Sequence, residues 1–397
     1  MNEEGEKDPV CFLLDETEPA SCHPTLIEGM RKLNTQGIPT KLLFIPCPDQ
    51  PTHPFLPEAG PYCPWVGDAL PPHRAVVATS LSTAVLAACY TNRGAYWLLD
   101  RNPFTEYEDR PMERALLPAL LQTGLVRAVA ANPVLAESLQ QRHGIGAEMS
   151  HLIPARPVVP RAAPGNSMPT TVVDHSSSVS DDVILSAASL NGLSARVVLL
   201  TELLAPPYAW AFSKVRTRSF CRSRHYTDAA LIVRLDSFHD AMGSLALMFA
   251  SGATVATTRA ALGRLPVNHP HEVWCFSDPD DPVCIRRETE LLLRNPELRT
   301  AISARAQATY KRWRQQSEES SWEPGEGAEE HRAAPPADMV ARILTSPRAA
   351  VWNTSVLRLL SSYYDTRRRQ GERNTPRRRG SRPSRRPVAP GNHCRGA

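Results

Sequence analysis

Short apolar runs alternate with amphipathic segments along most of this sequence. Residues 10–14 are apolar throughout, residues 26–33 repeat apolar side chains at helical spacing, and residues 40–45 form a second apolar run. Apolar runs joined by amphipathic helices are typical of β-α-β units in a parallel sheet. The alternation continues to about residue 153 and begins again after residue 169, which predicts two doubly wound α/β domains.

Breaks in this pattern divide the chain into parts. The stretch 154–169 contains five prolines and few residues that could pack, so we interpret it as a linker. The predicted organisation is a first Rossmann-like domain, the linker, a second Rossmann-like domain, a flexible acidic segment, helices that return to the first domain, and a disordered arginine-rich tail. The corresponding residues are 1–153, 154–169, 170–316, 317–336, 337–365 and 366–397.

The clearest unit of the second domain covers residues 226–258. An apolar strand (229–233) precedes a polar loop with Asp236, His239 and Asp240, and a short apolar helix and a second strand follow. In parallel α/β sheets, ligands bind where loops leave the carboxyl ends of strands. This loop is therefore the first place where we expect chemistry.

The charge of the chain is unevenly distributed. The net charge is +4, but residues 366–397 contain eleven arginines and a single acid, Glu372, so the remainder is mildly acidic. A basic tail of this kind could bind nucleic acid, anionic lipid or an acidic polysaccharide, or could simply keep the protein soluble.

The spacing of the cysteines and the first residues of the sequence indicate the cellular compartment of the protein. None of the nine cysteines forms a Cys-x-x-Cys pair, and the sequence begins with polar and acidic residues instead of a signal peptide. No apolar run approaches the length of a membrane span. We therefore expect a cytoplasmic protein with free thiols, with peripheral attachment to a membrane as an open alternative.

The order of these elements resembles that of GT-B glycosyltransferases. The second domain is similar to retaining nucleotide-sugar enzymes of family four, particularly those of cell-surface polysaccharide and rhamnan assembly. The first domain has looser similarity to the same enzymes. The segments with the resemblance are 226–229, 247–258 and 276–299 in the second domain and 77–84, 96–100 and 131–135 in the first.

The sequence departs from that family at its donor site. The family has a carboxylate pair eight residues apart, the first in a His-Glu-Gly-Phe-Gly loop, whereas this chain has His239-Asp240-Ala241-Met242-Gly243. Asp240 could replace the first carboxylate, but Met248, preceded by Leu247, occupies the second position. The family's Arg/Lys pair has only Arg196 in the equivalent region, and residues 15–21 contain no glycine.

The resemblance and the loop positions give a set of candidate site residues. We expect His239, Asp240 and Asp100 to take part in catalysis, and Glu202, Lys214, Arg216, Ser237 and Gly243 to bind the donor. Each has a plainer alternative: loop residues can be merely solvated, Glu202 can cap a helix, Asp100 can form a salt bridge, and residues 214–225 can be a solvated basic face.

The predicted function is transfer of a sugar from a nucleotide-sugar donor to a glycan, lipid or other acceptor, without a metal or a separate cofactor. Two alternatives stay open. A catalytically degenerate GT-B protein could bind a partner glycosyltransferase or a sugar nucleotide without turnover. A nucleic-acid-associated or DNA-modifying protein could use the arginine-rich tail.

Overall fold

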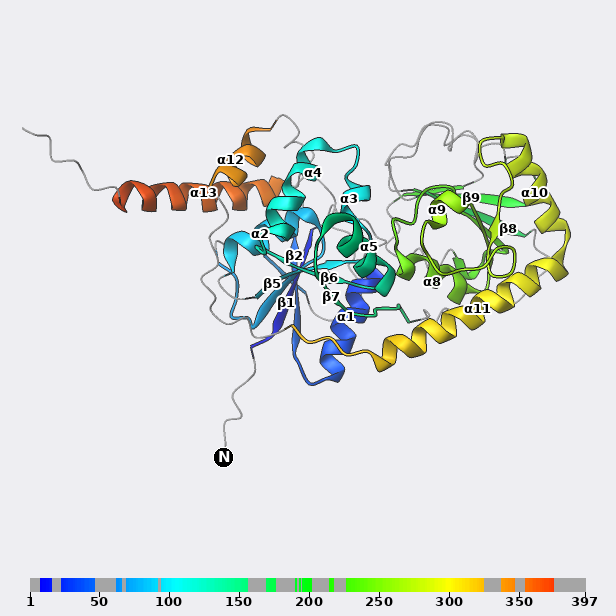
Figure 1. The fold of residues 1–397 in the computed structure, drawn as a ribbon, viewed down its shortest axis with the longest axis horizontal. Helices are drawn as coiled ribbons and strands as arrows, with labels where there is room; N and C mark the ends of the chain where they lie inside the picture. Colours follow the sequence, from blue (N-terminus) through cyan, green and yellow to red (C-terminus); the bar gives the residue numbers. More distant parts are fainter. Residues whose placement is uncertain are drawn as a thin grey trace, which may run out of the picture.

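Two parallel β-sheets form the centres of two α/β domains (Figure 1). The computed structural model describes residues 8–15, 23–46, 62–65, 69–91, 94–155, 169–175, 190, 193, 195–201, 214–217, 226–324, 337–346 and 354–374. The first sheet has the strand order β3-β2-β1-β4-β5-β6-β7. Its strands are β1 (Val10–Asp15), β2 (Thr40–Ile45), β3 (Tyr62–Pro64), β4 (Ala75–Ala78), β5 (Gly94–Leu99), β6 (Arg127–Ala130) and β7 (Ala147–Met149).

The second sheet has the order β10-β9-β8-β11-β12-β13, and all its pairings are parallel. Its strands are β8 (Thr170–His175), β9 (Arg196–Thr201), β10 (Lys214–Thr217), β11 (Leu231–Val233), β12 (Thr254–Thr257) and β13 (Trp274–Cys275). In both sheets the chain reverses its direction of travel across the sheet after the third strand, which is the Rossmann order. The predicted α/β class with two Rossmann-like domains is confirmed.

Helices connect the strands and cover the sheets. Those of the first domain are α1 (His23–Thr35), α2 (Leu81–Tyr90), α3 (Pro103–Glu106), α4 (Pro111–Leu117), which continues into a π-helical turn (Pro118–Gln122), and α5 (Pro133–His143). The later helices are α8 (Met242–Ser251), α9 (Arg259–Leu262), α10 (Pro282–Arg294), α11 (Pro296–Glu319), α12 (Ala337–Thr345) and α13 (Thr354–Asn374).

The end of α11 and the residues after it pack on the first domain, so the prediction of a flexible segment from residue 317 is wrong for 317–324. The Ser317 side chain is fully buried and its hydroxyl donates to the His151 carbonyl oxygen at 2.7 Å. The Trp322 ring is 5% exposed and lies edge-on to Tyr96 at 6.4 Å. Burial of this indole outweighs the polar composition of the segment. Residues 325–336 lie outside the described residues.

Two helices, α12 and α13, lie in the stretch from 337 where helices were expected to return to the first domain. Side chains of α12 and α13, including Val340, Ile343 and Leu360, join the apolar core beneath α2. The Tyr90 hydroxyl donates to the Leu359 carbonyl oxygen at 2.6 Å. Both helices lie on the side of the first domain that is away from the second (Figure 1).

Helix α13 continues to Asn374, which corrects the expectation that residues after 365 are disordered. Arginine, glutamine and glutamate in this stretch are good helix formers, and they outweigh the single Gly371. The rest of the arginine-rich tail lies outside the described residues, as do residues 156–168 of the linker. Strand β3 lies in the proline-rich stretch between β2 and β4.

Lys32 is a buried amine where α11 meets the first domain. Its Nζ donates to the His151 carbonyl oxygen at 3.1 Å and to Ser320 Oγ at 2.5 Å. Burial lowers the pKa of Lys32 to about 8, with Arg314 and Arg31 adding to the shift and Glu28 opposing it. Glu28 itself pairs with Arg314 at 2.8 Å. Burial in this contact therefore makes the protonated form of Lys32 less stable than it is in water.

We therefore expect the free energy of unfolding to depend on pH. Since the folded-state pKa of Lys32 lies below its unfolded value of about 10.4, the unfolded chain binds more protons between pH 8 and 10, and the free energy of unfolding should rise with pH there. Lys32→Met should lose this rise. Urea unfolding of both proteins at pH 7.5, 8.5 and 9.5 measures it, and equal pH slopes would contradict the assignment.

Candidate active site

The loop between β11 and α8 has an unusual backbone. His239 and Asp240 are consecutive non-glycine residues with positive φ, at 48° and 62°. This left-handed conformation costs roughly 1 kcal/mol or more per residue, so other contacts must hold it. The Phe238 amide donates to the Ala261 carbonyl oxygen at 2.9 Å, and the His239 amide donates to Ser237 Oγ at 3.0 Å.

The first domain holds the other side of this loop. The Asn102 amide donates to the His239 carbonyl oxygen at 2.8 Å, and Asn132 Nδ2 donates to the Asp240 carbonyl oxygen at 3.1 Å. We call these four residues the interdomain seam. Asn102 follows β5 and Asn132 follows β6 closely, so the carboxyl edge of the first sheet meets the carboxyl edge of the second here.

Both asparagines also begin helices. The Asn102 Oδ1 accepts from the Phe104 amide at 3.0 Å, and the Asn132 Oδ1 accepts from the Leu135 amide at 2.9 Å. In each case a proline follows, the usual order at a helix start. The Asn-Pro pair at 132–133 is a helix-start pattern in the sequence. Nothing in the sequence indicates that the side-chain nitrogen of Asn132 donates to a residue more than a hundred positions away.

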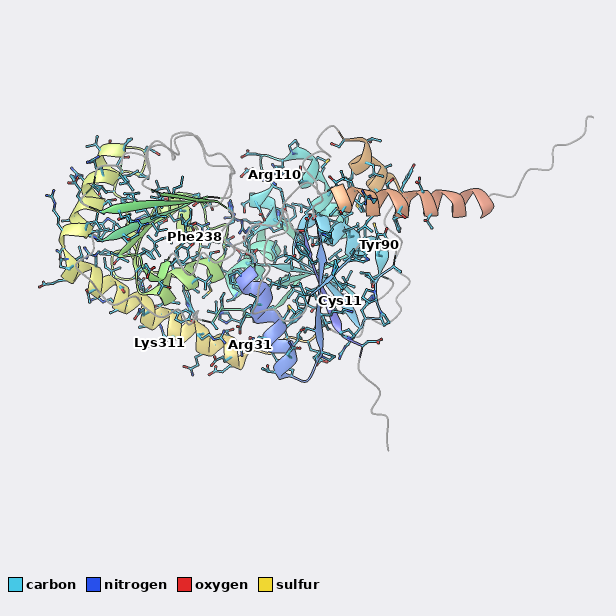
Figure 2. The ribbon with its side chains drawn as sticks, turned by 180° about the vertical axis from the view of Figure 1, so that it is seen from behind. Cys11, Arg31, Tyr90, Arg110, Phe238 and Lys311 are labelled. Carbon is cyan, nitrogen blue, oxygen red and sulfur yellow. The ribbon has the colours of Figure 1, made fainter. Side chains whose placement is uncertain are left out.

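Arg234 is a buried cation beneath the loop, and sequence analysis did not identify it. Its side chain is 3% exposed and lies 3.4 Å from Asp174 Oδ2 and 3.1 Å from Asp236 Oδ1. Its Nη2 donates to the Ser237 carbonyl oxygen at 3.0 Å, and its guanidinium lies 4.2 Å from the centre of the Phe238 ring. Phe238 is 1% exposed and belongs to the core of the second domain, among whose elements Figure 2 labels it. A single arginine directly after the apolar run 229–233 was the available signal.

His239 is a neutral imidazole at this position. Burial lowers the pKa of His239 to about 4, and Arg101 and Arg234 lower it further while Asp236 opposes them. Its Nδ1 is buried and has no hydrogen-bond partner among the described residues. A neutral ring under the influence of two guanidinium groups can accept or donate a hydrogen bond without adding charge.

We expect the ionisation of His239 to occur near pH 4. Below about pH 6.5 the unfolded chain binds a proton on this residue first, so acidification from 6.5 towards 4 should destabilise the folded state. A ¹³C NMR titration of the histidine side chains, with His239→Ala for assignment, measures the midpoint. A midpoint above about 6 would show that the ring is not buried as described.

The predicted site residues are only partly brought together. His239, Asp240 and Ser237 share the loop, and Gly243 lies in the first turn of α8, where an added Cβ would be 3.1 Å from Thr25 Oγ1. Asp100 follows β5 at the same edge, and its Oδ1 lies 3.6 Å from Arg101 Nε. Asp100 therefore forms a salt bridge in this structure, which was the plainer alternative to a role in catalysis.

The remaining donor-binding candidates are less defined. Glu202 lies outside the described residues. Lys214 and Arg216 belong to β10, the edge strand of the second sheet, and their side chains lie outside the described part. At the position expected for a second carboxylate, Met248 is fully buried in the core with Phe249, and Leu247 is 7% exposed.

Two further features are absent from the described ranges. No three histidine, cysteine, aspartate or glutamate side chains there are grouped so that they could hold a metal ion. None of the helices described is long and apolar enough to cross a membrane.

Comparison with solved structures identifies the fold. The chain superposes on sucrose-phosphate synthase from Thermosynechococcus elongatus with a TM-score of 0.52 at 11% identity, covering 77% of this chain and 95% of that one. HepE of Anabaena in complex with UDP and glucose gives 0.51 at 12% identity, covering 78% and 97%. WaaG, a glycosyltransferase of lipopolysaccharide biosynthesis, gives 0.51 at 10% identity, covering 76% and 95%.

Sequence comparison gives no further match. No protein-family model matches the chain, and no curated protein sequence matches it. At these identities the structural matches establish architecture and not activity. Two Rossmann-order sheets with their carboxyl edges joined across the interdomain seam, in a chain that superposes on these three structures over most of its length, have the GT-B fold.

Proposed function

We propose that this protein transfers a sugar from a nucleotide-sugar donor to an acceptor hydroxyl at the interdomain seam. The observation that supports this most directly is the strained His239–Asp240 loop, which both carboxyl edges hold in place. Backbone strain of this kind is concentrated at functional sites. A sugar donor bound there would contact both domains, as the resemblance to family-four enzymes implies.

The residues around the seam can be assigned roles in this reaction. The bond from the sugar C1 to the diphosphate oxygen breaks and the diphosphate leaves with the electron pair. The acceptor oxygen bonds to C1, and its hydroxyl proton passes to the departing diphosphate. The N-terminus of α8, which has no side-chain cap, offers amide groups to the leaving diphosphate. His239 and Asp240 would position the donor sugar, and Asp100 lies on the acceptor side.

A panel of donors tests the proposal. Thermal shift and hydrolysis are measured with UDP-, GDP-, dTDP- and ADP-sugars, without added metal and then with Mg²⁺. Stabilisation by one nucleotide class together with release of its sugar supports the transferase. No response to any donor, with glycan and lipid acceptors present, would rule out donor binding at the seam.

A second candidate function is a GT-B protein that binds a sugar nucleotide or a partner glycosyltransferase without turnover. The buried Met248 favours it, because a thioether in the core cannot accept hydrogen bonds from a ribose as a carboxylate does. The pairing of Arg234 with two aspartates favours it too, since its charge is largely compensated. Stabilisation by a donor without release of its sugar is the result that separates this candidate from the first.

A further inference from the structure

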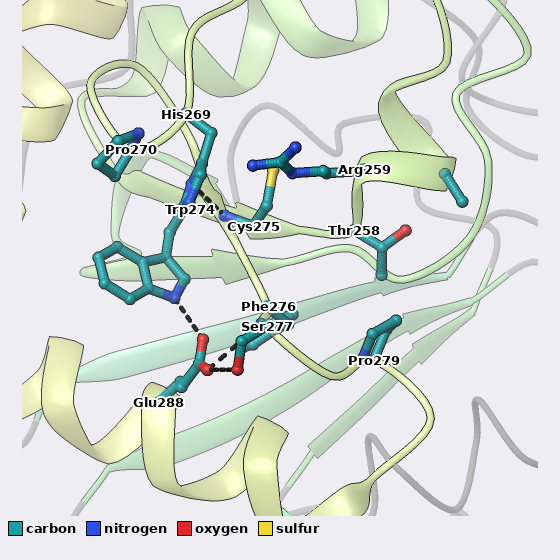
Figure 3. A pocket seen from close by; sticks show the side chains of 11 residues that line it. Thr258, Arg259, His269, Pro270, Trp274, Cys275, Phe276, Ser277, Pro279 and Glu288 are labelled. Carbon is teal, nitrogen blue, oxygen red and sulfur yellow. Dashed lines mark hydrogen bonds between the residues drawn. The ribbon is translucent and has the colours of Figure 1, made fainter.

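A pocket of about 490 Å³ opens at the carboxyl ends of β12 and β13 (Figure 3), and none of the four seam residues lines it. Its apolar walls come from Trp274, Phe276 and two prolines, Pro270 and Pro279. Pockets of this volume suit a ligand of one or two rings. Its position at the carboxyl edge of a Rossmann-order sheet is where ligands of such sheets bind.

Two hydrogen-bond donors are available at one end of this pocket. Arg259 projects from α9, and no ion pair or hydrogen bond of its guanidinium with another described residue is found. His269 Nδ1 accepts the Cys275 amide at 2.9 Å, which assigns the proton of the neutral ring to Nε2. Figure 3 shows Arg259 and His269 on the same side of the pocket, above Cys275.

The opposite end of the pocket holds a carboxylate that neutral donors surround. Glu288 accepts from Trp274 Nε1 at 2.7 Å, from the Ser277 amide and hydroxyl, and from Cys284 Sγ at 3.3 Å. Although burial opposes it, this set of donors keeps the pKa of Glu288 below its usual value. Burial raises the pKa of the Cys275 thiol, so this side chain adds no negative charge. The Glu288 oxygens thus accept hydrogen bonds from the pocket wall at this end, and Arg259 is the cation at the other end.

We propose that this pocket is a second ligand site, separate from the seam, for a small ring compound that bears a phosphate or a carboxylate. The anion pairs with the Arg259 guanidinium and the His269 Nε2–H, since arginine binds both groups through two parallel hydrogen bonds. The ring lies against Trp274. A sugar phosphate, a uronic acid and a nucleoside monophosphate share this chemistry.

Helix α9 separates the site from the seam and also connects the two. Its residue Ala261 accepts the Phe238 amide at 2.9 Å through its carbonyl oxygen. A Cβ on Gly263, which ends the helix, would lie 3.5 Å from Asp240 Oδ1. The ligand would therefore bind on the opposite side of one helical turn from the His239–Asp240 loop.

Isothermal titration of the full chain tests the site with glucose 6-phosphate, glucuronate and uridine 5′-monophosphate, and with glucose and inorganic phosphate as single-feature probes. At least one ring anion should bind with a Kd below about 1 mM and at least about tenfold more tightly than either single-feature probe. The preferred ring anion identifies the source of the ligand.

Substitutions at Arg259 test whether the ligand binds in this pocket. Arg259→Ala should weaken it at least about tenfold, and Arg259→Lys less, because lysine keeps the charge and loses the two-point geometry. The exposed Arg294→Ala on α10 is the matched control and should bind as the wild type does, with equal melting temperatures for all three. Binding that survives in Arg259→Ala, or that is absent for every ring anion, overturns the proposal. If the double variant His239→Ala/Asp240→Ala also loses binding, the ligand site is not separate from the seam.

Discussion

Replacing Arg234 by methionine is expected to destabilise the second domain by about 3–5 kcal/mol, the usual cost of leaving a buried charge without its partner. The Asp174 side chain is fully buried, and besides Arg234 it accepts a hydrogen bond from the Tyr226 hydroxyl at 2.9 Å. A neutral tyrosine cannot compensate a carboxylate charge at this depth. The variant also loses the contact with Phe238.

Urea unfolding of the full chain, followed by far-UV circular dichroism, measures this loss as a shift of the transition that belongs to the second domain. The matched control is the double variant Arg234→Met/Asp174→Asn. Removing the carboxylate charge should restore more than half of the lost stability, since the asparagine can still accept the Tyr226 hydrogen bond. A single variant within about 1 kcal/mol of the wild type would contradict the burial of this pair.

The variant His239→Ala/Asp240→Ala should lower the transfer rate by about 10²–10³-fold, the scale of removing a preorganised hydrogen-bonding group from a transition state. The seam itself should survive, because Asn102 and Asn132 donate to the backbone carbonyl oxygens of these residues and not to their side chains. A fall in rate without a fall in melting temperature is therefore the expected combination.

The rate is measured with the donor that the panel identifies, under saturating acceptor. His271→Ala is the matched control: this histidine is exposed on the same domain, where Arg305 Nη1 contacts it at 2.6 Å. It should transfer at the wild-type rate. If the double variant kept more than about a third of the wild-type rate, His239 and Asp240 would have no part in the reaction.

The sequence predicted the architecture because apolar runs specify buried strands wherever they occur. Residues 229–233 and 253–256 contain β11 and much of β12, and the loop between strand and helix was found by its polarity. Burial that depends on distant partners was not predictable in this way. Trp322 lies in a polar segment, and its apolar environment comes from a first-domain cluster that includes Tyr96, more than two hundred residues earlier.

The candidate site shows the same limit. His239 and Asp240 were found from the loop, but the roles of Asn102 and Asn132 in the seam depend on the meeting of two sheets. Arg234 was missed because a single arginine after a strand is common, and its pairing with Asp174 requires β8 and β11 to be neighbours. Glu202, Lys214 and Arg216 remain predictions, since their side chains lie outside the described residues.

The return of the C-terminal helices to the first sheet has a consequence for synthesis. The core beneath α2 includes Val340, Ile343 and Leu360, and the opposite face of the same sheet includes Trp322. Most of the second core, from Val172 to Trp313, has left the ribosome before any of these four residues does. Domains usually fold in the order in which they are made, but here the half that is translated first should be the last to become stable.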